Sequence, residues 1–324
     1  MLFKKWNAFF NPEQYQGWGK TKNYFEGWYF KVLTKPCDEA LAIIPGISMD
    51  PDGKKIAFIQ ILDGNLQQSD FYKFDGSAFQ ATPGKFEIQI NENRFSESEI
   101  SLNLPNIKGT LTFENLVGWP KPWYSPGIMG PYAFVPFMEC YHGIVSMDHD
   151  IQGQLIYHSR TLDFCNGKGY IEKDWGHSFP SAYVWMQSNH FSKQGISFKA
   201  SVAKIPWIRN SFVGFIAGLW FENKLIRFTT YNNTNLRKCH ITLDQVELIL
   251  ENSNYLLEIQ AYRSQATQLA SPIQGVMDGR IEESMRSKIS VKLYSKKEKK
   301  IVFSDIGHHA AMEVAGTIDE IQIN

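Results

Sequence analysis

Carboxylates and aromatic rings lie close together in residues Tyr170–Phe191, which read YIEKDWGHSFPSAYVWMQSNHF. Glu172 and Asp174 both lie within three residues of Trp175. In a strand the two carboxylates share one face, where like-charge repulsion can raise the pKa of one of them. Such a group could deliver a proton as a general acid. In the alternative interpretation, Asp174 is a buried hydrogen-bonding anchor for the turn at Gly176.

The second half of this segment predicts a strand with one aromatic face. After Pro180, a period of two places a set of rings and amides on the same side of the strand. The set consists of Tyr183, Trp185, Gln187, Asn189 and Phe191. Aromatic walls with two neutral polar groups suit a large apolar ligand that has a polar end.

A second aromatic strand is predicted at Tyr24–Val32, which reads YFEGWYFKV. Alternation places Glu26 on the same face as Trp28 and Phe30. Burial of an unpaired carboxylate is costly, so Glu26 either has a partner or carries a proton at neutral pH. In the third interpretation, Glu26 lies at the strand end and reaches water.

Segments with alternating apolar residues, such as Lys85–Asn91, run through most of the chain and are separated by short turns. Many short strands at such spacing predict an all-β fold of the barrel or sandwich type. Only Gly275–Ser287 has a pattern that could form a short helix.

The two tryptophan-rich motifs suggest an internal duplication. YFEGWYFKV opens a first run of strands, and IEKDWG with AYVWMQSNHF opens a second run. We therefore expect two domains, residues 1–160 and residues 161–324.

Residues Gly118–Phe137 hold five prolines among six aromatic residues. A segment with so many prolines cannot be a central strand. It is either a connection that packs over one end of a barrel, or an apolar lid or lipid-contacting surface.

Composition excludes several functional classes. The 324 residues carry a formal net charge of zero, which argues against a nucleic-acid partner. Aromatic residues make up 14% of the chain, which indicates aromatic-lined cavities. Four widely spaced cysteines suit a reducing compartment, and the N-terminus lacks the apolar core of a signal peptide. We therefore expect a cytoplasmic protein that contacts membranes only peripherally.

Sequence motifs for common cofactors are missing. The chain contains no phosphate loop, no dinucleotide-binding glycine motif and no GxSxG elbow. His309 and Glu313 would share a strand face, but His308 points the other way, so no metal site is predicted there. We expect no cofactor and no metal.

Several segments together resemble the tocopherol cyclase family of prenylquinol cyclases. They are YFEGWYFKV (Tyr24–Val32), PYAFVPFMECYHGIVS (Pro131–Ser146), GYIEKDWGHSFPSAYVWMQSNHF (Gly169–Phe191), ASPIQGVM (Ala270–Met277) and SDIGHHAAMEVAGT (Ser304–Thr317). They occur in order over most of the chain. The chain starts almost directly at the domain, without a transit peptide, which is typical of a bacterial relative.

The resemblance implies a fold of two lipocalin-like β-barrel or sandwich halves packed together, with few short helices. It also implies a cofactor-independent enzyme that closes a chromanol ring on a prenylated hydroquinone. Asp174 or Glu172 would then deliver or relay the proton, with Glu26 as a further candidate acid. The expected substrate-binding residues are Trp28, Trp175, Tyr183, Trp185, Gln187, Asn189 and His142.

Two other functions use the same pocket. The protein could carry or sense an isoprenoid or other lipid without catalysis, in which case the carboxylates are structural. It could also hydrate an isoprenoid double bond, which needs the same acid but admits water.

Overall fold

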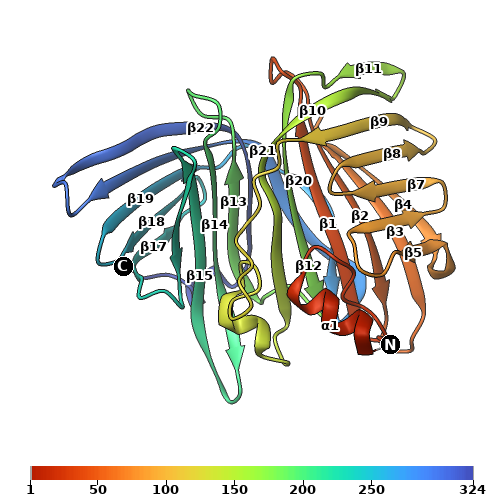
Figure 1. Cartoon of the computed structure of the whole chain (residues 1–324), viewed down its shortest axis with the longest axis horizontal. Helices are drawn as coiled ribbons and strands as arrows, with labels where there is room; N and C mark the ends of the chain where they lie inside the picture. The colour runs from red at the N-terminus through yellow and green to blue at the C-terminus, as the bar shows by residue number, and fades with distance from the viewer. Residues whose placement is uncertain (1, 324) are drawn as a thin grey trace. The chain divides into compact units, whose positions relative to one another are not determined.

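The computed structural model describes residues 2–323 and consists almost entirely of antiparallel strands (Figure 1). The strands form one 12-stranded and one 10-stranded sheet. The predicted all-β fold with two halves is confirmed.

The chain divides into two compact units. Unit 1 runs to Phe179 and also includes Leu269–Arg280, whereas unit 2 consists of Pro180–Gln268 and the chain from Ile281 onward. The division therefore lies nearly twenty residues beyond the expected boundary after residue 160, and the chain returns once to unit 1.

The first sheet has the strand order β4-β3-β2-β1-β12-β10-β9-β8-β7-β6-β5, with β11 paired to β10. Its strands are β1 (Tyr24–Leu33), β2 (Ala40–Met49), β3 (Lys55–Asp63), β4 (Gln68–Asp75), β5 (Phe79–Ala81), β6 (Glu87–Ile90), β7 (Asn93–Ser96), β8 (Glu99–Asn103), β9 (Ile107–Glu114), β10 (Cys140–Tyr157), β11 (Arg160–Asp163) and β12 (Gly167–Gly176). Nearly all neighbours along the chain are neighbours in the sheet, as in a meander.

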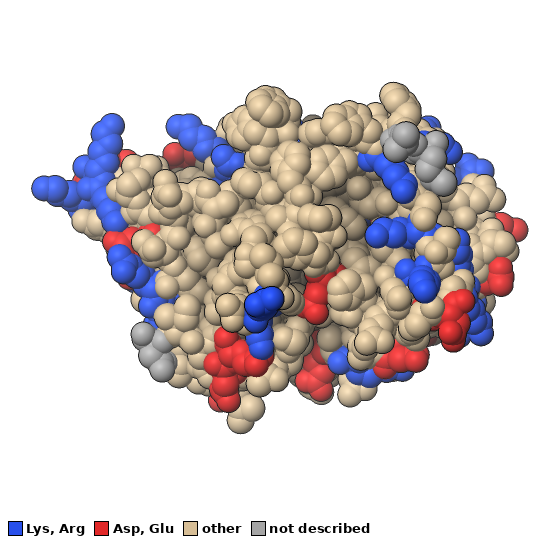
Figure 2. Space-filling view, turned by 90° about the horizontal axis from the view of Figure 1, so that it is seen from below, with Lys and Arg blue, Asp and Glu red and all other residues tan. Residues whose placement is uncertain are grey.

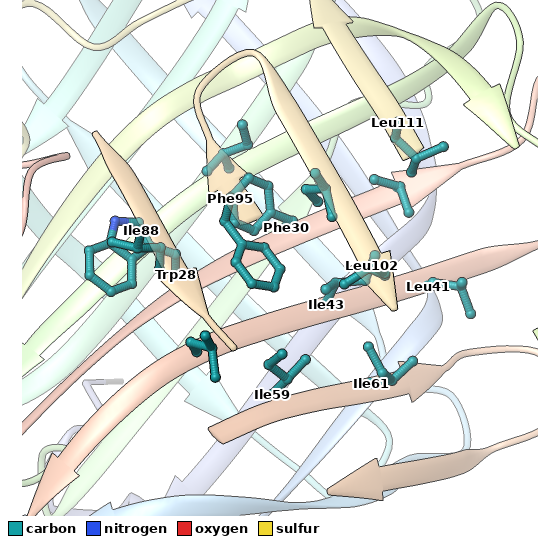
Figure 3. Close-up of a cluster of buried hydrophobic side chains, with 14 of the residues drawn as sticks. Trp28, Phe30, Leu41, Ile43, Ile59, Ile61, Ile88, Phe95, Leu102 and Leu111 are labelled. Carbon is teal, nitrogen blue, oxygen red and sulfur yellow. The ribbon is translucent and has the colours of Figure 1, made fainter. Parts of the chain in front are cut away.

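A single apolar core lies on one face of this sheet. Side chains from β1, β2 and β3 meet side chains from β6 to β9, although these strands are far apart in the sheet order (Figure 3). Trp28, for example, stacks on Phe86 with 5.6 Å between ring centroids. The sheet therefore curls around its own core in the manner of a barrel.

The second sheet has the order β16-β15-β14-β13-β22-β21-β19-β18-β17, with β20 paired to β21. Its strands are β13 (Ala182–Ser188), β14 (Ser197–Trp207), β15 (Asn210–Phe221), β16 (Lys224–Thr229), β17 (Asn235–Ile241), β18 (Gln245–Glu251), β19 (Tyr255–Tyr262), β20 (Thr267–Ile273), β21 (Val276–Ser295) and β22 (Lys300–Gly316). In β18 the residues Val246, Leu248 and Leu250 are buried and their neighbours are half-exposed. This alternation builds the core of unit 2.

One suggested helix is a strand, and one helix of the structure was not predicted. Gly275–Ser287, the one predicted helix, is mostly strand β21, which follows a tight turn in which Gln274 and Gly275 both have positive φ. The chain instead has helix α1 (Leu2–Phe10), which the aromatic content of this segment obscured. The 3₁₀ turns are η1 (Gly76–Ala78), η2 (Gly130–Phe134) and η3 (Ile318–Glu320). Within residues 2–323, no helix has both the length and the apolar character to cross a bilayer.

One buried histidine makes the stability of unit 1 depend on pH. Burial, and then the nearby charge of Lys168, lower the pKa of His149 from 6.5 to about 3. The ring packs on Phe113 with 4.7 Å between centroids, and Nδ1 lies 3.1 Å from Ser146 Oγ. The folded state therefore holds His149 neutral, while the unfolded chain takes up a proton below about pH 6.5.

We expect this histidine to destabilise the protein progressively as the pH falls from about 6.5 to about 3. One proton taken up on unfolding lowers the free energy of unfolding by up to about 1.4 kcal/mol per pH unit. Chemical denaturation of the wild type and of His149→Gln over this range measures the difference in slope. Equal slopes for both proteins would contradict the assignment.

Candidate active site

The two aromatic motifs lie side by side in unit 1. Strand β12 lies between β1 and β10 and pairs with both in antiparallel register (Figure 1). Asp174 faces Gly27 of β1 on one side and His142 of β10 on the other. The motifs proposed to open two repeats therefore belong to adjacent strands, and because Gly27 has no side chain, β1 leaves Asp174 uncovered.

One face of the sheet at β12 and β10 carries an acidic cluster, defined here as Tyr170, Glu172 and Asp174 of β12 and His142 of β10. His142 Nδ1 lies 2.7 Å from Asp174 Oδ1, and its Nε2 lies 3.5 Å from Glu172 Oε2. The hydroxyl of Tyr170 donates a hydrogen bond to Glu172 Oε2. Two hydrogen-bonded pairs, Tyr170 with Glu172 and His142 with Asp174, therefore lie next to each other, and the ion-pair contact between His142 and Glu172 links them.

The acidic cluster is buried at one end and open at the other. Glu172 is buried, whereas the side chain of Asp174 keeps 24% of its exposure. Burial, and then the charge of Glu172, raise the pKa of Tyr170 well above its usual value, so its hydroxyl stays protonated. Burial and Asp174 likewise hold the pKa of Cys140 well above its usual value. Asp174 is thus the accessible carboxylate of the cluster.

The opposite face of β12 holds a fully buried ion pair. Lys173 Nζ lies 2.5 Å from Glu26 Oε1, and both side chains are completely buried. The same ammonium group donates hydrogen bonds to the carbonyl oxygens of Pro12 and Gln14. Burial lowers the pKa of Lys173, and the charge of Glu26 opposes this effect. The interpretation in which Glu26 reaches water is therefore wrong, and the interpretation with a partner is confirmed.

Glu26 is saturated with hydrogen bonds. The backbone N–H groups of Gln16 and Gly17 donate to it at 2.8 to 3.1 Å, and the Tyr24 hydroxyl donates at 2.5 Å. With Lys173, these donors use both carboxylate oxygens. A carboxylate so engaged fixes the segment after α1 to β1 and β12 and has no free position from which to approach a substrate.

Trp28 and Trp175 surround the same ammonium group. Lys173 Nζ lies 4.8 Å from the centroid of Trp28 and 4.7 Å from that of Trp175, as in cation–π contacts. Trp175 also stacks on Tyr141 of β10. The structure therefore places both tryptophans on the opposite face of the sheet from Asp174 and Glu172.

The remaining predicted residues belong to β13 and the residue after it in unit 2. Tyr183, Trp185, Gln187 and Asn189 are all buried. Val184 and Met186, on the alternate positions, belong to the core of unit 2, so the predicted face is the other face of this sheet. Here the Tyr183 hydroxyl donates to Glu313 Oε2 at 2.7 Å.

Three residues of these arrangements, Tyr170, Lys173 and Glu313, were not predicted as site residues. Tyr170 and Lys173 flank the predicted acids in the same strand, and alternation alone could have assigned them to the two faces. Glu313 became a partner of Tyr183 only through the pairing of β13 with β22, a contact between residues 130 positions apart.

The acidic cluster also has donor atoms that suit a metal ion. His142, Glu172 and Asp174 each offer one ligand atom, and these atoms all lie within 4.8 Å of one another. Imidazole and carboxylate are ligands for zinc and iron as well as members of proton relays. The arrangement can therefore move a proton or hold a divalent cation.

We expect Glu26→Gln to lower the free energy of unfolding by about 3–5 kcal/mol, because it leaves the Lys173 ammonium group buried without its counter-charge. Chemical denaturation measures this loss. Glu258→Gln is the matched control, since Glu258 forms an exposed ion pair with Lys292 and its loss should cost much less. A Glu26→Gln protein as stable as the control would refute the structural role of the pair.

The sequence profile of the tocopherol cyclase-like family matches residues 59–316. A probable chloroplastic tocopherol cyclase of Oryza sativa subsp. japonica is 24% identical over an alignment of 372 positions, which covers 92% of this chain and 76% of the rice protein. A chloroplastic tocopherol cyclase of Zea mays is 23% identical, and the match covers 78% of this chain but only 55% of the maize protein.

Solved structures show the same fold. CghA in complex with Sch210972 is similar with a TM-score of 0.56 at 11% identity, over 90% of this chain and 88% of CghA. A protein of Nitrosomonas europaea, described as a putative AttH, has a TM-score of 0.53 at 12% identity, over 91% of this chain and 93% of that protein. Because the family profile extends over most of the sequence, as the quoted motifs indicated, the chain belongs to the tocopherol cyclase-like family.

Proposed function

We propose that the protein is a prenylquinol cyclase, in which the acidic cluster protonates the first double bond of the prenyl tail and the phenol oxygen then closes a chromanol ring. The observation that carries the proposal is the pairing of His142 with Asp174 and Glu172. Membership of the tocopherol cyclase-like family supports the same reaction class.

The reaction requires an acid held close to the alkene. Protonation at the less substituted carbon leaves a tertiary cation, and attack by the phenol oxygen then forms the C–O bond. The phenol loses its proton in the same sequence, so the reaction is an isomerisation without net oxidation or reduction. The protein must therefore donate one proton and accept another, which a group of coupled acids and bases can do.

Asp174 is the proposed donor because it is the open end of the acidic cluster. His142 Nδ1 lies 2.7 Å from Asp174 Oδ1, and its Nε2 lies 3.5 Å from Glu172, the second carboxylate of the acidic cluster and the proposed acceptor of the phenol proton. Tyr170 hydrogen-bonds to Glu172 at the buried end and keeps its own proton. Glu26 has no part in the reaction, because Lys173 and its backbone donors occupy it.

Four further residues that the sequence pattern predicts for substrate binding belong to unit 2. Tyr183, Trp185 and Gln187 lie in β13 and Asn189 follows it, and all four are buried. Their part in substrate binding stays a prediction. A closed apolar site is needed, since water would otherwise capture the cation.

Product analysis tests the proposal directly. We expect incubation with a prenylhydroquinone to give the isomeric chromanol, identified by chromatography and mass spectrometry. Recovery of unchanged quinol bound to the protein would favour a carrier or sensor instead. A tertiary alcohol, heavier than the substrate by one water molecule, would favour a hydratase.

We expect Asp174→Asn to reduce the single-turnover rate by about 10² or more while the fold survives, because the amide can still accept a hydrogen bond from His142 but cannot donate an acidic proton. Asp150→Asn is the matched control, since Asp150 lies in the same sheet and pairs with Lys168 away from the acidic cluster. A destabilised but fully active Asp174→Asn protein would make Asp174 a structural anchor and overturn its role as the acid.

Chelation separates a proton relay from a metal site at the same residues. We expect a strong chelator to leave the cyclisation rate unchanged, because the proposed step uses only protein groups. Metal analysis of the protein before and after chelator treatment verifies that any bound metal has been removed. Loss of the rate that returns when zinc or iron is added back would show that His142, Glu172 and Asp174 work as ligands.

A further inference from the structure

Helix α1 presents an aromatic stripe to solvent. Phe3 and Trp6 are 80% and 68% exposed, and Phe10 follows on the same face at the i, i+3, i+7 spacing. Ala8, on the other side of the helix, is buried against the protein. The helix therefore packs through its small residue and leaves its large apolar residues in water.

The proline-rich segment 118–137 extends this apolar surface. Trp123 is 79% exposed, and Tyr124, Phe134 and Phe137 are also exposed. Phe134 contacts Phe9 of α1 with 5.1 Å between ring centroids. The segment is also tied to the residues after the helix by an ion pair of 2.8 Å between Lys121 and Glu13. The helix and the segment are thus in contact within unit 1. Their exposed aromatic residues are named here the aromatic platform: Phe3, Trp6, Trp123, Tyr124, Phe134 and Phe137.

The charge of α1 has a single sign. Its charged residues are Lys4 and Lys5, and no acidic residue accompanies them in the helix. Lys5 is exposed, and Lys4 lies over the ring of Trp18. Figure 2 looks at the molecule from the side on which α1 lies and shows uncharged surface with both basic and acidic side chains around it. Apolar rings flanked by lysines complement an anionic surface.

The residue types of the aromatic platform favour binding to a lipid bilayer. Tryptophan, tyrosine and phenylalanine prefer the boundary between lipid headgroups and acyl chains. Adjacent lysines add attraction to anionic headgroups, and each is worth about 1 kcal/mol near such a surface. Large contiguous apolar patches are rare on soluble proteins unless they bind something.

We propose that the aromatic platform docks onto an anionic lipid bilayer, with Phe3, Trp6 and Trp123 inserted at the headgroup boundary and Lys5 on the anionic headgroups. The inference rests on exposure and charge alone and does not depend on the proposed cyclase reaction. A bilayer-bound protein would have direct access to lipid-soluble molecules.

Vesicle flotation tests the docking without any substrate. We expect the wild type to float with vesicles of phosphatidylcholine and phosphatidylglycerol, and much less with phosphatidylcholine alone. The double substitution Phe3→Ser and Trp6→Ser should lower the partition coefficient at least about tenfold, since two large apolar side chains leave the lipid. Lys5→Gln should reduce the preference for the anionic vesicles several-fold.

Leu243→Ser is the matched control, because Leu243 is 88% exposed but lies outside the aromatic platform. Its partition should equal that of the wild type. Wild-type protein that fails to float with either vesicle overturns the proposal, as does an equal loss for Leu243→Ser. Sedimentation velocity tests whether a second copy of the chain binds this surface instead. A wild-type protein that dimerises but does not float, and whose dimer is lost in Trp6→Ser, would assign the surface to dimer formation.

Discussion

The buried ion pair between Glu26 and Lys173 is the interaction on which the arrangement of unit 1 depends. It joins β1 to β12 across their shared register and, through the backbone of residues 12–17, anchors the segment that follows α1. Two charges removed from water are stable only with complete compensation, and here hydrogen bonds and two tryptophan rings provide it. The ion pair therefore stabilises the observed register of β12 against β1, and the pairing of β12 with β10 brings Asp174 opposite His142.

Alternation along β12 places the residue that stabilises the fold and the residues proposed for catalysis on opposite faces of the strand. Lys173 points to the structural face, while its neighbours Glu172 and Asp174 point to the face with His142. The ion pair of Glu26 and Lys173 is fully buried, whereas the acidic cluster reaches solvent at Asp174. The same few residues can thus hold the fold rigid and keep an accessible acid, as a site on a strand of a packed sheet requires.

Features that depend on the local sequence pattern could be predicted from the sequence. Alternating residues predicted the all-β fold and the face shared by Glu172 and Asp174, and the cost of burial predicted that Glu26 needs a partner. The identity of that partner could not be predicted, because Lys173 lies 147 positions away and only strand pairing brings it near. The division between the units was displaced for a similar reason, since β12 resembles the start of a new repeat but completes the first sheet. Helix α1 was missed because its exposed aromatic face is not the pattern of a helix that packs on a core.

Turnover of a prenylhydroquinone in deuterium oxide shows whether an acid held by the protein protonates the prenyl double bond. We expect a chromanol with one deuterium on the ring carbon adjacent to the carbon that bears the new ether oxygen, and on only one face of that carbon. A chromanol without deuterium would mean that ring closure does not begin with protonation. Deuterium divided equally between both faces would mean that solvent, rather than the acidic cluster, delivers the proton.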